Sequence, residues 1–144
     1  MNRKDIESLI MSEEEEFFFT GGVSVEYIRE IEKELNTRLP ESYKWFLGNY
    51  GHGGINGVLI QGVGLDKSLQ VVNTTLSLRE YGLPRNLVVI ESMDEYVYCL
   101  DTTQMTNNDY PIVDWDQSIG IGKKQYDNLY NYLYDRFTDA IENL

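Results

Sequence analysis

The sequence predicts an α+β fold in which N-terminal helices and a C-terminal helix pack on a mainly antiparallel sheet of four to six strands. Apolar residues recur at helical spacing in the first 50 residues and again in the last 20. Between them, 87–91, 95–100 and 111–115 are strand-like segments. Only three residues separate the first two of these, which favours an antiparallel hairpin.

Length and composition fit one globular domain. The chain has 144 residues, of which 42% are hydrophobic and 12% aromatic, enough for a buried core. We therefore expect residues 1–144 to form a single domain. No apolar run approaches the roughly 18 residues of a membrane-spanning helix, and the first residues do not resemble a secretory leader. We expect a cytoplasmic protein that binds no membrane.

The charge balance indicates the kind of partner. Twenty-four acidic residues against twelve basic ones leave a net charge of -12. Such a charge opposes direct binding to nucleic acid or an anionic surface and attracts a basic protein. The alternative is that acidity only keeps the protein soluble.

The first helix is expected within residues 2–12, and four glutamates and three phenylalanines follow it at 13–19. The glutamates oppose the dipole at the end of the helix and can keep the phenylalanine run from aggregating. The functional alternative is an acidic and aromatic patch that grips a basic partner.

Two further helices are expected before residue 51. The stripe of the first consists of Val25, Ile28, Ile31 and Leu35, and the face of the second consists of Tyr43, Phe46, Leu47 and Tyr50. Pro40 starts the second helix and Gly51 ends it. Trp45 points away from this face, and we expect it to pack in a second layer rather than to meet a partner.

The middle of the chain contains both strand-like and helix-like segments. Residues 58–61 read as a strand, and 65–81 fit both strand and helix. We predict a helix there, because Gly82 and Pro84 follow it as helix-ending residues. Residues 102–109 form a polar connection long enough to be mobile, and 117–124 form a turn.

The last helix is predicted over about 125–143. Its buried face is Tyr126, Leu129, Tyr130, Leu133, Phe137, Ala140 and Ile141. Tyr132 lies off that face and Tyr134 at its margin. Both are candidate partner anchors, because tyrosine is large, stiff and half polar, although single exposed aromatics are common.

No residue pattern indicates catalysis. His52 is the only histidine, it lies between glycines, and no nucleophile or orienting acid accompanies it. Cys99 is the only cysteine and lies in a predicted strand, so we expect a core residue and no zinc cluster. We predict no catalytic residue, no metal and no cofactor.

Two short motifs suggest ligands without supporting them. Residues 120–124 precede a predicted helix as a phosphate loop does, but the first glycine and the final Ser or Thr of that pattern are missing. Lysines there are left with weak anion binding at most. Asp114 and Asp116 fall on one side of an extended segment and suit a divalent cation, but a strand end explains them equally.

A partner-binding role suits the acidic residues better. They lie at predicted strand ends and in loops, where an acidic rim can form: Asp94, Glu95, Asp101, Asp109, Asp114 and Asp116. Whether they share one edge of the sheet is open at this point.

One segment resembles a known family. Leu39-Pro40-Glu41, Tyr43-Lys44, Phe46-Leu47 and the glycines after Tyr50 follow a helix with Ile28, Ile31 and Leu35, and this order is similar to the defining segment of the SUKH superfamily. The resemblance extends from about Ser24 to the C-terminus, so 23–144 is its core and 1–22 precedes it. It implies the fold first. Bacterial members are mostly immunity proteins that neutralise polymorphic toxins, often nucleases, and eukaryotic relatives are regulators linked to cell-wall synthesis.

The resemblance therefore implies a bacterial immunity protein, an antitoxin, that binds a cognate toxin and blocks it by occlusion. A basic nuclease is the expected partner, met by a monomer or weak homodimer. The alternative is a non-enzymatic regulatory or scaffold module that recruits other proteins.

Overall fold

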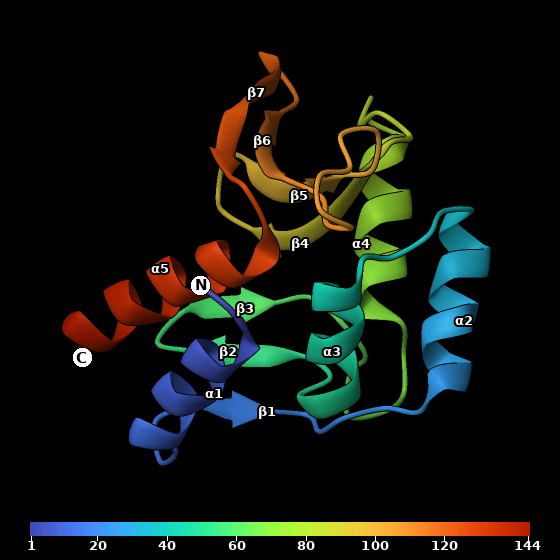
Figure 1. Ribbon diagram of the computed structural model, residues 1–144. Coiled ribbons are helices and arrows are strands. Elements are labelled where there is room, and N and C mark those ends of the chain that lie inside the picture. The colour runs from blue at the N-terminus through green and yellow to red at the C-terminus, as the bar shows by residue number, and fades with distance from the viewer.

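The computed structural model describes all 144 residues as five helices and seven strands (Figure 1). The chain begins with α1 (Arg3–Ser12), the two-residue strand β1 (Phe18–Phe19), α2 (Val25–Leu35) and α3 (Glu41–Asn49). Strands β2 (Gly53–Ile55) and β3 (Val58–Ile60) follow, and then α4 (Gln70–Arg79). Strands β4 (Leu87–Ser92), β5 (Val97–Asp101), β6 (Ile112–Asp116) and β7 (Gly120–Tyr126) precede the C-terminal α5 (Leu129–Glu142). The predicted α+β class is confirmed.

The strands divide into two antiparallel sheets, whereas the sequence predicted one. The smaller has the order β1-β2-β3 and the larger β4-β5-β6-β7. The amide of Gln61, just after β3, donates to the carbonyl of Ile90 in β4 at 2.8 Å. Helix α5 lies against β2 and β3 and also against β7, so it bridges the two sheets (Figure 1).

Glycines allow the tight pairing of the smaller sheet. A Cβ on Gly53 would lie 2.1 Å from the carbonyl oxygen of Phe18, and one on Gly54 would lie 2.0 Å from that of Val58. Any larger residue would push the strands apart. This pairing adds β1, with the exposed Phe18 and the half-buried Phe19, to the edge of β2 that β3 does not occupy.

The larger sheet is buried on both faces along most of β4, β5 and β6. Alternate residues such as Val88, Leu100 and Ile112 face the main core, which they share with α1, α2, α3, α5 and the smaller sheet. The residues between them, such as Cys99 and Trp115, form a second cluster on the other face. Continuous burial explains why these strands read as apolar runs.

Several predicted elements are confirmed. Helices α2, α3 and α4 lie within the predicted segments, β4 and β5 form the predicted antiparallel hairpin, and Cys99 is buried. Trp45 packs edge-on against Tyr50 with ring centroids 5.5 Å apart, in agreement with the packing prediction. Gly82, with φ of 102°, follows α4 as expected.

Other segments differ from the prediction. Residues 120–126 are strand β7 and not a turn and the start of a helix, so α5 begins at Leu129 and not near residue 125. Strands β1 and β2 were not predicted, because two or three residues rich in glycine and phenylalanine leave no alternation to recognise. None of the five helices is long and apolar enough to cross a membrane.

Candidate partner-binding surface

The six acidic residues singled out in the sequence lie in different places. Asp94 and Glu95 are exposed in the β4–β5 turn, beside a small hollow of about 230 Å³. Asp114 and Asp116 are half-buried on β6, and Asp116 accepts hydrogen bonds from the turn that leads into β7. Asp101 and Asp109 line another, larger hollow together.

That shared hollow has a volume of about 750 Å³. Strands β6 and β7, the connection 102–111 and the start of α5 form its walls. Its lining is mainly polar, with carboxylates from Asp101, Asp109 and Asp127 and amides from Gln104, Asn107 and Asn128 among the groups around it. Such a lining suits a charged or strongly hydrogen-bonding group better than an apolar one.

The connection 102–111 is held in place from both sides. Asn107 and Asn108, with φ of 53° and 62°, form a two-residue turn, across which Thr106 and Asp109 exchange backbone hydrogen bonds of 2.8 and 3.0 Å. Asparagine is among the residues that tolerate this left-handed conformation best. The Ser42 hydroxyl of α3 donates to the Asp109 carboxylate at 2.9 Å. These contacts fix the carboxylate of Asp109 at the wall of the hollow.

The carboxylates of Asp101 and Asp109 have hydrogen-bond donors but no cation. Asp101 accepts from Asn86 at 2.9 Å and from the Thr103 hydroxyl at 2.7 Å, and neither aspartate forms an ion pair. Burial raises the pKa of Asp109 above its ordinary value, against the lowering effect of its hydrogen bonds. Lys124, the only basic residue of the lining, is 2.6 Å from Asp127.

Tyr130, in the first turn of α5, connects this hollow to a second one of about 570 Å³. Its half-buried ring packs edge-on against Trp45 of α3, with centroids 5.6 Å apart. Burial raises the pKa of Tyr130, the nearby charges of Asp109, Glu41 and Glu7 raise it further, and the charge of Arg3 lowers it. We call the area formed by Tyr130, Trp45, Asp101, Asp109 and Asp127 the Tyr130 surface.

Two tyrosines of α5 are buried to a different extent than the sequence predicted. Tyr132, expected off the buried face, has 0% of its surface exposed, and Tyr130, expected within the core stripe, lines the two hollows. Tyr132 lies three residues after Leu129, which places it on the same buried side of α5. Tyr134 is half-buried against the main core.

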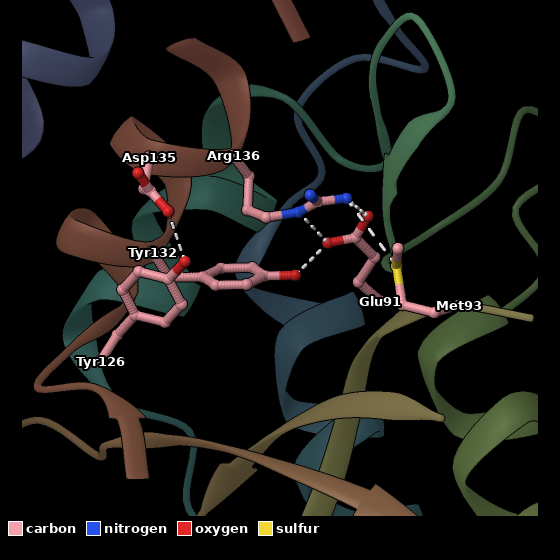
Figure 2. A network of polar contacts seen from close by, with 6 residues as sticks. All are labelled: Glu91, Met93, Tyr126, Tyr132, Asp135 and Arg136. Atoms are coloured by element: carbon pink, nitrogen blue, oxygen red, sulfur yellow. Dashed lines mark hydrogen bonds and ion pairs between the residues drawn. The ribbon is translucent and has the colours of Figure 1, made fainter. Parts of the chain in front are cut away.

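Tyr132 belongs to a buried polar network that joins α5 to β4 (Figure 2). Its hydroxyl donates to the carboxylate of Glu91, which is 1% exposed. The Arg136 guanidinium donates two hydrogen bonds of 2.9 and 2.7 Å to the same carboxylate, and this contact raises the pKa of Arg136. Tyr126 donates to Asp135 at 2.5 Å beside it. The network accounts for Tyr132 as a packing residue.

The remaining chemical candidates have structural explanations. The Nδ1 of His52 accepts the Gly62 amide at 2.9 Å, and burial lowers the pKa of the imidazole. Residues 120–124 lie in β7 and not in a loop before a helix. No group of three or more His, Cys, Asp or Glu side chains is placed to hold a metal ion.

Comparisons with known proteins agree with this fold. A family model described as SMI1-KNR4 cell-wall (SUKH_5) matches residues 3–138, and so includes the N-terminal segment as well. A solved structure described as "Crystal structure of protein from Pseudomonas syringae pv. tomato" superposes with a TM-score of 0.71 and 16% identity, over 96% of this chain and 99% of that chain. At this identity the likeness shows a shared fold.

Proposed function

The chain belongs to the SUKH family, in its SMI1-KNR4 group, and from that membership we propose that it is an immunity protein that binds and neutralises a cognate toxin, a basic nuclease. The observation that carries the proposal is the family match over residues 3–138. Family members commonly act through protein partners. Neutralisation then follows from occlusion, in which the bound chain covers the active centre of the toxin.

The charge of the chain supports a basic partner. A net charge of -12 attracts cationic proteins over distances of about 10 Å at moderate ionic strength. The Tyr130 surface adds a place for close contact, because it combines the carboxylates of Asp101 and Asp109, which have no cation, with the aromatic ring of Tyr130. Aromatic anchors with complementary charges around them are typical of tight protein interfaces.

The test is protection of cells together with co-purification. A nuclease toxin encoded beside this chain is expressed alone, with this chain, and with an unrelated acidic protein of similar net charge. We expect only this chain to restore growth and to co-purify with a catalytically inactive form of the toxin. Growth arrest in the presence of the folded chain, without co-purification, contradicts the proposal.

The second candidate is a regulatory scaffold that recruits proteins without inhibiting an enzyme. The description of the matched family, which refers to the cell wall, favours it. A scaffold contact that is mainly apolar keeps its affinity at high salt, whereas attraction of a basic toxin weakens. Affinity measured at low and high ionic strength therefore separates the two.

A further inference from the structure

We propose that the hollow of about 750 Å³ receives a lysine or arginine side chain of the protein partner, with Asp101 and Asp109 as its carboxylate acceptors and Tyr130 at its rim. The inference deepens the proposed function, on which its naming of a toxin partner rests. It assigns the contact to one place on the chain and states which chemical group the partner must present.

The first step is the charge balance of the hollow. Its lining holds three carboxylates, from Asp101, Asp109 and Asp127, and one ammonium group, from Lys124. Lys124 is engaged by Asp127 at 2.6 Å. Asp101 and Asp109 therefore line the hollow without an ion-pair partner, and an entering cation completes the balance.

The second step is that both carboxylates are partly removed from water. Asp101 has 9% of its surface exposed, and the Asp109 carboxyl is desolvated enough for its pKa to rise. A carboxylate in such a setting interacts more strongly with a cation than one on an open surface does, because less water screens the pair. Asp94 and Glu95, on an exposed turn, lack this advantage.

The third step is the chemistry of the rim. Tyr130 presents an aromatic ring to both hollows, and Gln104, Asn107 and Asn128 place amide groups around the larger one. A guanidinium or ammonium group gains from an aromatic neighbour, and amide oxygens accept its further hydrogen bonds. Aromatic, carboxylate and amide groups together are the complement of an arginine or lysine side chain.

An anion is the competing occupant, because the first turn of α5 lies at the hollow and helix N-termini attract negative charge. Two features oppose it here. The Asn128 side chain already accepts the hydrogen bond of the Asn131 amide at 2.9 Å, and Asp127 precedes the same turn. The experiment decides between the two charges directly.

The first experiment needs no toxin. The ¹⁵N-labelled chain is titrated with the peptide Gly-Arg-Gly, with its uncharged analogue Gly-citrulline-Gly, and with Gly-Glu-Gly, and amide shifts are followed by NMR. We expect saturable shifts for the arginine peptide within 104–109, 121–124 and 128–131, with affinity about tenfold above that of the citrulline peptide. Equal binding of all three, stronger binding of the glutamate peptide, or shifts centred elsewhere overturns the inference.

Matched variants sharpen the test. Asp109→Asn removes one charge in the hollow, and Asp139→Asn removes one near the C-terminal end of α5, where Asp139 is exposed. Tyr130→Ala is compared with Tyr81→Ala, an exposed tyrosine after α4. We expect each hollow variant to weaken the arginine peptide about fivefold or more and each control less than about twofold. Thermal unfolding verifies that each variant is folded.

The second experiment uses a toxin that the chain neutralises. Asp109→Asn and Tyr130→Ala are expected to weaken toxin binding about tenfold or more, while Asp139→Asn and Tyr81→Ala stay within about twofold. Neutralisation with equal affinity for all four variants leaves the proposed function intact and overturns the inference. Binding of the arginine peptide in the hollow without neutralisation of any toxin supports the cation site and contradicts the proposed function.

Discussion

Glu91 carries a charge in a place where water cannot solvate it. Only 1% of its surface is exposed, and the bidentate contact with Arg136 of α5 compensates the carboxylate (Figure 2). Removing one partner of such a pair leaves an uncompensated buried charge, which costs about 3–5 kcal/mol. The pair thus makes the position of α5 sensitive to a single side chain.

We therefore predict that Arg136→Met lowers the free energy of unfolding by about 3–5 kcal/mol, as measured by urea denaturation. The double variant Glu91→Gln with Arg136→Met is expected to recover part of the loss, because no buried charge remains. Lys124→Met is the control, since its ion pair with Asp127 is exposed and exposed pairs contribute about 1 kcal/mol or less. A loss at Arg136 no larger than that of the control contradicts the prediction.

His52 makes stability depend on pH. Burial lowers its pKa below the ordinary 6.5, and the neutral ring accepts the Gly62 amide. Near pH 6 the unfolded chain therefore binds more protons at this residue than the folded chain, so stability falls as pH decreases through 6.5. We predict that the free energy of unfolding of the wild type, minus that of His52→Gln, is smaller at pH 5.5 than at pH 7.5. Chemical denaturation at the two pH values measures it. A difference that is constant or grows towards acid pH is the contrary result.

At the residue scale, the burial of Tyr132 could not be predicted from helical spacing alone. The predicted face of the last helix is confirmed at Leu129, Leu133, Phe137 and Ala140, and Tyr132 is buried beside it. Its hydroxyl donates to the carboxylate of Glu91, 41 residues earlier in the chain. A partner of that separation has no signal in a single sequence.

At the scale of elements, the amphipathic helices were predictable and the irregular strands were not. Helix α2 has a clean stripe of Ile28, Ile31 and Leu35, and the strands β4 and β5 are apolar runs with a short link. Strand β7, Gly120–Tyr126, is largely exposed at the edge of its sheet, and its two lysines and two glycines give it no apolar alternation. Its pairing with β6 defines it, and that pairing is a tertiary contact.

Asn128 is the N-cap residue of α5, and the helix begins at the next residue. Its side chain accepts the hydrogen bond of the Asn131 amide at 2.9 Å, and β7 occupies the residues before it. We predict that Asn128→Ala lowers the free energy of unfolding by about 1 kcal/mol, because a helix N-terminal donor loses its acceptor. Asn128→Asp, which keeps the acceptor, is expected to stay close to wild type in the same denaturation experiment. Equal losses in both variants argue against the cap.

At the scale of the whole molecule, the fold brings together segments that are far apart in the chain. The Tyr130 surface combines α3, the connection 102–111 and the start of α5. Sequence reasoning found Asp101 and Asp109 as acids at strand ends and loops, but it did not separate them from Asp94 and Glu95, because their common hollow exists only after β6 and β7 pair. The net charge, in contrast, can be counted from the sequence, and it attracts a basic partner to the whole molecule rather than to one surface.

These two features predict different effects on the kinetics of binding a basic toxin. Long-range attraction depends on net charge, and its range falls from about 10 Å at 0.1 M salt to about 3 Å at 1 M. We predict that the association rate constant decreases at least about tenfold from 0.05 to 0.5 M salt, with little change in dissociation. Stopped-flow fluorescence measures both rate constants.

Two variants separate attraction from contact. The double variant Asp139→Asn with Glu142→Gln removes two negative charges at the exposed C-terminal end of α5, so the net charge changes from -12 by two units towards zero. It is expected to slow association modestly and to leave dissociation unchanged, because neither residue lies at the Tyr130 surface. Asp109→Asn removes one charge but is expected to speed dissociation, because its carboxylate is partly desolvated. An association rate that is insensitive to salt, with equal dissociation for both variants, indicates an apolar contact elsewhere and favours the scaffold alternative.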